Sequence, residues 1–364
     1  MWNVLVVPPP EGWEGNAGRS IRSILAWHEA EIADSGTGAG GHDIEFIHLP
    51  PLDEASAPSA TLPINAKTVA VLSFASSEVD RILAGRLAGS SVPLLMAGGE
   101  EVLIDRPGGG PLPNLFALDL YRDYRCAAFA LYAARKLQPE AHVALAASRF
   151  TVNQEREAKI CYGLLDDAGF MPMPFWMDAS ASDAFGMVSE EIQSAADGVL
   201  IAFIGNMGAR EMWRAFMRVR TPWRIWNCAA PDDSYLSCRG MIFADQNLFL
   251  SDRGGFGELR RRLWNTRAMR LPDLVAGGRA EALAEWLRRA IAALPQPVDV
   301  LDRGALLRAL AGVRDIPFGA QTLDIAPGLH RPATREVCIA EVRDRRYVML
   351  EALTAPGLPY SPSY

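Results

Sequence analysis

Short apolar runs recur along the chain, and most of them end in small or turn-forming residues. The clearest is VAVLSFASS at residues 69–77, where four apolar residues are followed mainly by serine and alanine. A short apolar run bounded by turn signals is typical of a strand buried on both faces of a sheet. Comparable runs predict strands at residues 3–7, 44–48, 92–96, 115–118, 142–146, 173–177, 198–203, 224–226 and 240–244.

Amphipathic segments separate these runs, so strands and helices alternate. That order is typical of α/β folds with parallel sheets. A first array ends near residue 118, and a second of similar size begins at Asp119. The helical pattern covers residues 17–33, 77–87, 121–137, 152–168, 184–195, 209–219, 256–265, 271–276, 279–294 and 303–313.

The end of the chain changes character. Residues 319–324 and 336–343 alternate apolar and polar positions, and residues 347–350 follow a turn at 344–346. This alternation predicts an antiparallel hairpin rather than another strand–helix unit. The last residues are rich in proline and serine and are expected to be frayed.

Composition narrows the class of protein. A chain of 364 residues with 49% hydrophobic and 22% charged residues suits two globular domains. The net charge of −7 argues against a nucleic-acid partner. No apolar run approaches the roughly 18 residues of a membrane span. The N-terminus, MWNVLVVPPP, lacks the basic and long apolar regions of a signal peptide.

The chain offers little that indicates catalysis. Its five histidines are scattered without metal-ligand spacing, and neither a nucleophile elbow nor a phosphate-binding P-loop occurs. We therefore expect no enzymatic activity, no metal and no cofactor. The competing hypothesis is an α/β enzyme such as a nucleotide-sugar transferase, for which Asp232 and Asp233 are the only close acidic pair at a suitable loop.

None of the five cysteines forms a CxxC pair. Cys228 and Cys238 could close a disulfide across the intervening turn in an oxidising compartment. The alternative is that all five are separate small residues of the core.

Three segments carry a family resemblance: AHVALAASRFTVNQEREAKICYGLLDDAGF, GVLIAFIGNMGAREMWRAFMRV, and the C-terminal stretch from RALAGVRDIPFG through RDRRYVML. In order and pattern they resemble the type I periplasmic binding proteins, in particular the branched-chain amino acid (Leu/Ile/Val) receptors of ABC transporters. The resemblance extends over residues 3–350, and its C-terminal segment is the most specific part.

That resemblance implies two Rossmann-like α/β lobes with parallel sheets, joined by a three-strand hinge. The first lobe would comprise residues 1–118 and 247–315, and the second residues 119–246 and 316–351, leaving 352–364 as a tail. A small ligand would bind between the lobes, which would close on it by a hinge motion.

The family's pattern also implies ligand-binding positions in the first lobe. Trp13 matches an aromatic residue in the first loop. Ser73, Ala75 and Ser76 match a loop that binds the ligand carboxylate, and Ala97, Gly98 and Glu100 match a second carboxylate-binding loop. Alternatives stay open, because Trp13 could pack on its own lobe and the serines could simply cap a helix. Glu100 and Glu101 depart from the family, since a carboxylate beside a ligand carboxylate is unfavourable.

In the second lobe, Phe150 and Thr151 match the family's aromatic loop, Asn206 matches the next ligand-facing loop, and Asp232 falls near the acid that receives a ligand amino group. Arg149 is a further candidate for an anionic ligand. The alternative for Asp232 is a simple turn residue in the sequence PDDS.

The function implied is capture of a small solute, an amino acid or related compound, for an ABC transporter permease. The alternative is a cytoplasmic ligand sensor on the same scaffold, which the absence of a signal peptide favours. The resemblance implies a periplasmic location reached with a signal sequence that was removed or lies upstream of Met1.

Overall fold

The computed structural model describes residues 1–35, 41–98, 112–118, 122–148, 152–177, 197–204, 206–228, 235–245, 265, 271–295, 300–318, 321–326, 328, 330–332 and 336–355. Contacts divide the chain into two compact units. Unit 1 comprises Met1–Leu120 and Asp252–Thr334, with Tyr360–Tyr364 at the terminus. Unit 2 comprises Tyr121–Ser251 and Arg335–Pro359. The chain thus passes between the units at points that lie outside the described residues. The predicted hinge also falls outside the described residues.

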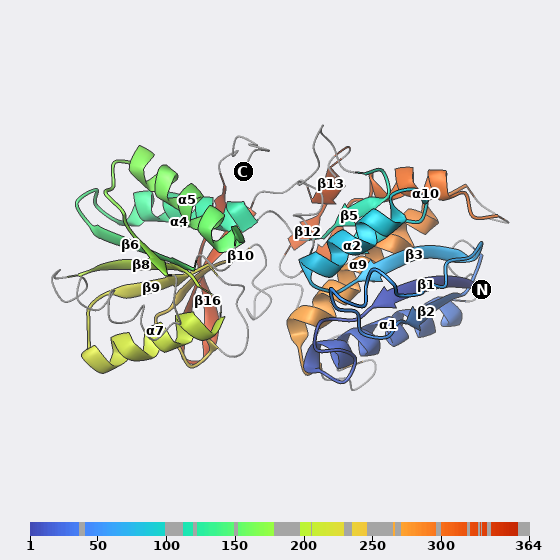
Figure 1. Ribbon diagram of the computed structural model, residues 1–364, viewed down its shortest axis with the longest axis horizontal. Coiled ribbons are helices and arrows are strands. Elements are labelled where there is room, and N and C mark those ends of the chain that lie inside the picture. The colour runs from blue at the N-terminus through green and yellow to red at the C-terminus, as the bar shows by residue number, and fades with distance from the viewer. Residues whose placement is uncertain are drawn as a thin grey trace. The chain divides into compact units, whose positions relative to one another are not determined.

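Unit 1 is built on a five-stranded parallel sheet, shown in blue and cyan in Figure 1. Its order, β2-β1-β3-β4-β5, places the first strand of the sequence between the second and the third. The strands are Trp2–Val7 (β1), Ile44–His48 (β2), Thr68–Ser73 (β3), Leu94–Met96 (β4) and Leu115–Ala117 (β5). The strand positions predicted from the apolar runs are therefore confirmed to within one or two residues.

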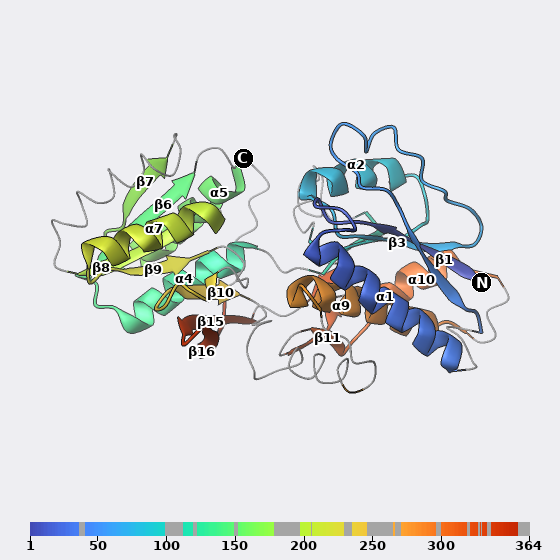
Figure 2. The same ribbon diagram turned by 90° about the horizontal axis from the view of Figure 1, so that it is seen from below.

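Helices cover both faces of this sheet, as a strand buried on both sides requires. Helix α2 (Ser77–Leu87) packs Leu83 into a cluster with Val71 and Leu94. Helices α1 (Asn16–Asp34) and α9 (Leu274–Ala292) lie side by side on the opposite face (Figure 2). There Phe116 of β5 meets Trp286 of α9 edge to face, with ring centroids 5.7 Å apart. Helix α10 (Arg303–Leu310) packs against α9.

Helix α9 corrects one sequence prediction. The Gly277–Gly278 pair predicted a break between two helices, whereas a single helix runs through both residues. A side chain at Gly277 would come within 2.4 Å of Leu271 and 3.6 Å of Ile24 in α1. The glycine therefore permits close packing of α9 on α1, and this tertiary contact outweighs its weak helix propensity.

Residues 316–334 were predicted to belong with the second lobe, but they group with unit 1. They form two short antiparallel ladders, β11–β12 and β13–β14. The first lies against α9, and the second lies beside β5, where Ala117 donates its N–H to the His330 carbonyl at 3.0 Å. The strands are Ile316–Phe318 (β11), Gln321–Leu323 (β12), Ile325–Ala326 (β13) and Arg331–Pro332 (β14).

Unit 2 is built on a seven-stranded mixed sheet of order β16-β15-β10-β9-β8-β6-β7. Helices α4 (Arg122–Lys136) and α5 (Val152–Asp167) cover one face, and α7 (Asn206–Val219) covers the other (Figure 1). The parallel strands are His142–Ser148 (β6), Met173–Met177 (β7), Gly198–Phe203 (β8), Arg224–Asn227 (β9) and Ile242–Asp245 (β10).

The predicted C-terminal hairpin is present and completes the unit 2 sheet. Strands β15 (Glu336–Arg343) and β16 (Arg346–Thr354) pair antiparallel, and β15 also pairs antiparallel with β10. Both turn residues have positive φ, 48° at Asp344 and 59° at Arg345, as a two-residue type I′ turn requires. Strand β16 extends to Thr354 and buries Leu353, so the tail predicted to begin at residue 352 is wrong for its first residues.

No helix among the described residues is both long enough and apolar enough to cross a membrane.

Gly18 provides a test of how closely α1 approaches the loop after β1. A Cβ at Gly18 would lie 2.2 Å from the Gly12 carbonyl oxygen and 2.7 Å from the Trp13 Cα, both backbone atoms. We expect Gly18→Ala to lower the free energy of unfolding by about 1–3 kcal/mol through overpacking. The matched control is Gly85→Ala in α2, where the added Cβ meets nothing within 4 Å.

The control should raise the free energy of unfolding by about 0.5–1 kcal/mol, because alanine loses less backbone entropy on folding than glycine. Urea unfolding followed by circular dichroism measures both effects. Equal effects of the two substitutions would contradict the close approach.

Candidate functional site

The carboxyl ends of the parallel strands in unit 1 form one edge of the sheet. The register aligns Val7, Ser73, Met96 and Ala117 in a single row across β1, β3, β4 and β5. Ala97 continues the pairing by donating its N–H to the Ser73 carbonyl at 2.8 Å. The loops that follow these strands therefore leave the sheet at the same edge. In open α/β sheets this is the edge at which ligands bind.

Ser73 is fully buried at the end of β3 and is engaged within the protein. Its hydroxyl donates to the carboxylate of Asp80, which is also fully buried, and accepts the Ala75 N–H at 3.3 Å. Ser73 thus connects β3 to the first turn of α2. The arrangement gives its hydroxyl a structural role, and Asp80, seven residues further on, was not singled out in the sequence.

Ser76 is the N-cap of α2, which agrees with the alternative that this serine caps a helix. Its backbone is extended (φ −69°, ψ 159°), and its hydroxyl accepts the Val79 N–H at 3.4 Å. Three residues here are half-buried: Ala75, Ser76 and Gly98. A Cβ added to Gly98 would meet no atom within 4 Å. Among the described residues that follow β3 and β4, these three are the predicted site positions that remain accessible.

Trp13 is held by its own unit. Its indole Nε1 donates to the Leu49 carbonyl at 2.6 Å, and its ring meets His48 edge to face at 4.6 Å. Its carbonyl accepts a hydrogen bond from Arg22 at 3.1 Å. This packing agrees with the alternative that Trp13 is a loop aromatic packed on its own lobe, although the residue is half-exposed.

Strands β6, β8, β9 and β10 of unit 2 likewise end at one edge. Their register pairs Ala147 with Phe203, and Asn227 with both Ala202 and Phe243. At this edge the Asp245 carboxylate, at the end of β10, lies 3.7 Å from the Arg125 guanidinium of α4. Both side chains are buried.

This buried ion pair was missed in the sequence. Its only signal in the sequence was an aspartate that directly follows the apolar residues 242–244. Arg125 lies 120 positions earlier (245 − 125), so no local pattern connects the two residues.

Several predicted site residues lie outside the described part of the chain: Glu100, Glu101, Arg149, Phe150, Thr151, Asp232 and Asp233. Asn206 begins α7, and only its backbone is described. Of the predicted positions, the structure therefore brings together those that follow β3 and β4 in unit 1. The roles of the others remain predictions.

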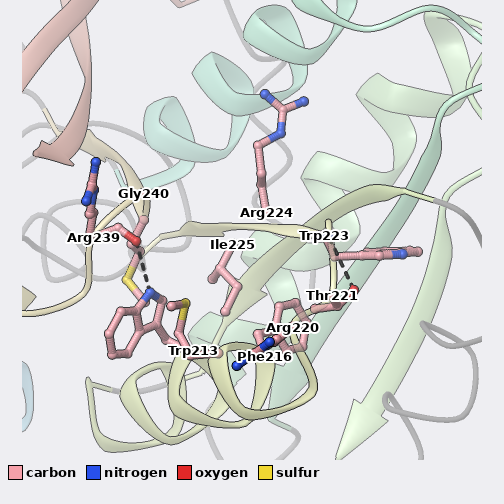
Figure 3. A pocket seen from close by; sticks show the side chains of 11 residues that line it. Trp213, Phe216, Arg220, Thr221, Trp223, Arg224, Ile225, Arg239 and Gly240 are labelled. Atoms are coloured by element: carbon pink, nitrogen blue, oxygen red, sulfur yellow. Dashed lines mark hydrogen bonds between the residues drawn. The ribbon is translucent and has the colours of Figure 1, made fainter.

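Unit 2 also contains a surface pocket of about 310 Å³ (Figure 3). It lies at the amino ends of β9 and β10, beside the C-terminal half of α7. This is the opposite edge of the sheet from the predicted ligand loops. Trp213 donates its indole N–H to the Arg239 carbonyl at 3.1 Å across one wall. The other lining residues are Phe216, Met217, Arg220, Thr221, Trp223, Arg224, Ile225, Gly240 and Met241.

His330 lies beyond β5 in unit 1 and is partly buried. Its Nδ1 donates to the Leu115 carbonyl at 2.9 Å, and its ring stacks on Phe116 with centroids 4.5 Å apart. Burial lowers the pKa of His330 below its ordinary value of 6.5, although hydrogen bonds to the Leu115 and Leu112 carbonyls act in the opposite direction. The neutral imidazole is therefore favoured in the folded protein.

Neither family models nor curated proteins match this chain in sequence. Solved structures match its fold over nearly the whole length. An ABC transporter solute-binding protein from R. palustris, in complex with benzoate, has a TM-score of 0.74 at 13% identity, covering 98% of this chain and 97% of that one.

Two further structures are similar. An ABC transporter substrate-binding protein from Desulfitobacterium hafniense, in complex with Leu, gives a TM-score of 0.73 at 12% identity, with 96% and 100% of the chains covered. A fatty acid ABC transporter substrate-binding protein from Thermomonospora curvata gives 0.71 at 14%, with 97% and 92% covered. The chain therefore has the α/β fold of the type I periplasmic binding proteins, as the sequence resemblance predicted.

The buried Ser73–Asp80 hydrogen bond predicts the effect of removing its donor. Ser73→Ala leaves the Asp80 carboxylate buried without this hydroxyl, so we expect the free energy of unfolding to fall by about 1–3 kcal/mol. Asp80→Ala and the double variant complete a mutant cycle measured by urea unfolding. The double variant should cost less than the sum of the two single variants, and strict additivity would contradict a direct interaction.

The lowered pKa of His330 predicts a contribution to stability that depends on pH. Between the lowered folded pKa and 6.5, the unfolded chain binds more protons than the folded protein at this residue. The contribution is therefore complete above about pH 7 and is lost as the pH falls through 6.5 toward the folded pKa.

His330→Asn is the matched variant, because asparagine tolerates the positive φ of 55° at this position and can still donate to a carbonyl. Urea unfolding from pH 8 to pH 5 should show stability falling more steeply in the parent than in this variant. A constant difference across this range would show that His330 does not titrate as predicted.

Proposed function

We propose that this chain is a solute-binding protein, which captures a small organic ligand and presents it to the permease of an ABC transporter. The observation that carries the proposal is the match in fold to solute-binding proteins of ABC transporters over nearly the full length of both chains. Such a match includes both units and the C-terminal hairpin, rather than a single Rossmann-like module that many enzymes share.

The carboxyl edge of the unit 1 sheet supports binding of a ligand with an anionic group. Helix α2 begins there, and the first N–H groups of a helix attract anions. Ser76 already caps the Val79 N–H, and Ala75 and Gly98 add half-buried backbone next to it. Small residues at these positions let a ligand approach the backbone closely.

The predicted residues of the other loops complete the proposed site. Phe150 would pack on the apolar part of the ligand, Thr151 and Asn206 would hydrogen-bond to it, and Asp232 would pair with a positive group. This set suits an amino acid or a related compound, whereas the carboxylate of Glu100 in unit 1 would repel a ligand carboxylate bound beside it. The ligands named for the similar structures, benzoate, Leu and fatty acids, are all carboxylates with an apolar body.

A thermal-shift screen tests the proposal on the full chain. The probes are amino acids, aromatic carboxylates and fatty acids, each over a range of concentrations. A ligand that binds only the folded protein stabilises it by RT ln(1 + [L]/Kd), about 2.7 kcal/mol at 100 times Kd. We expect at least one class to raise the melting temperature progressively with concentration, and no shift in any class would contradict a solute-binding role.

The site residues are tested with the ligand that the screen identifies. Phe150→Ala and Asp232→Asn should each weaken binding at least about tenfold, or 1.4 kcal/mol, by calorimetry. The control is Asp344→Asn, which removes the same charge at the β15–β16 turn, where asparagine accommodates the positive φ. Unchanged binding in the first two variants would reject these positions while leaving the proposed class of protein intact.

A further inference from the structure

Three potential metal ligands converge inside unit 2. The Sγ atoms of Cys126 and Cys228 and a carboxylate oxygen of Glu157 all lie within 4.8 Å of one another. All three residues are buried, with Cys126 fully inaccessible. They come from three separate elements, because Cys126 lies on α4, Glu157 on α5, and Cys228 directly after β9.

The distance between the sulfur atoms agrees with metal coordination. The two Sγ atoms are 4.0 Å apart. Two thiolates bound tetrahedrally to one ion, at about 2.3 Å each, lie about 3.8 Å from each other. A disulfide would require about 2.05 Å, roughly half the observed separation. The thiols are therefore already placed near the positions that two ligands of one ion would occupy.

Cys161 is a further buried cysteine of α5, outside the group of three whose ligand atoms lie within 4.8 Å of one another. It follows Glu157 by four residues on α5, so both side chains lie on the same face of that helix. Cys161 is fully buried.

We propose that Cys126, Glu157 and Cys228 form a binding site for one thiophilic divalent cation of the zinc class. Two sulfur donors and one carboxylate oxygen are all ligand types that such an ion binds. Each thiol that coordinates releases its proton to solvent, and no electrons are transferred.

Proton release explains how such a site can exist in a buried environment. Without an ion the two cysteines act as small core residues. A bound cation stabilises the thiolates directly, so metal binding becomes stronger as the pH rises.

The site would connect α4, α5 and the end of β9. Because Cys228 directly follows the last residue of β9, the ion would also fix the end of that strand. This role is independent of the proposed solute, since the cation would be a structural component of unit 2.

The test is a titration of the full-length chain, reduced, freed of metal with a chelator and kept free of oxygen. Zn²⁺ is added and bound metal is measured by elemental analysis, while Cd²⁺ is used to detect the ultraviolet thiolate-to-cadmium charge-transfer band. We expect saturation at one ion per chain, a higher melting temperature with Zn²⁺, and apparent affinity that rises with pH.

Cys126→Ser and Cys228→Ser should each weaken binding at least tenfold, and the double variant should abolish the band. The matched control is Cys238→Ser, which alters another buried thiol of unit 2 outside the cluster and should bind like the parent. If the double variant does not fold, Glu157→Gln provides the same comparison.

Three results would overturn the proposal. They are binding below one ion per chain in the parent protein, an unchanged band in the cysteine variants, and a Cys126–Cys228 disulfide that forms readily in air and persists in the presence of Zn²⁺. Mass spectrometry identifies the disulfide, because the oxidised chain is lighter by two hydrogens and recovers them only with a reductant.

Discussion

The fold depends on parallel strands that are buried on both faces and paired in register. In unit 1 this register sets Val7, Ser73, Met96 and Ala117 in one row, all of them inaccessible to solvent. Such a row fixes where each following loop starts. A shift of one strand by one residue would turn all of its side chains to the opposite face of the sheet and break their contacts with the helices. These contacts therefore fix the register, and the register keeps the loops at one edge. The position of any ligand site in the unit follows from that constraint.

The sequence predicted this framework well, since apolar runs report burial directly. The bounds predicted for β2, β7, β8 and α2 match the structure. The predictions that differed depended on contacts between distant segments. The two glycines of α9 predict a break in the helix, and only the packing of α9 on α1 explains why the helix continues through them. Residues 316–334 have no local signal that assigns them to unit 1, because their partners are α9 and β5.

The sequence predicted the edge of the sheet at which the candidate site lies, but it predicted the roles of the individual side chains less well. A serine at the end of a strand looks the same in sequence whether it faces a ligand or, as Ser73 does, a buried aspartate. The cysteines show the same limit more clearly. Their closeness in sequence drew attention to Cys228 and Cys238, whereas the nearest sulfur to Cys228 that the structure records belongs to Cys126, 102 residues away.

The proposed solute-binding role and the proposed cation site would place different demands on the same edge of unit 2. Ligand-binding loops need freedom to adapt, while the elements that support them need to be rigid. The Arg125–Asp245 ion pair and the cluster of Cys126, Glu157 and Cys228 both link a covering helix to the end of a strand. Both are buried, so their rearrangement would leave unpaired charge or thiols in the core. Polar links of this kind between a covering helix and the end of a strand hold this edge of the sheet in place.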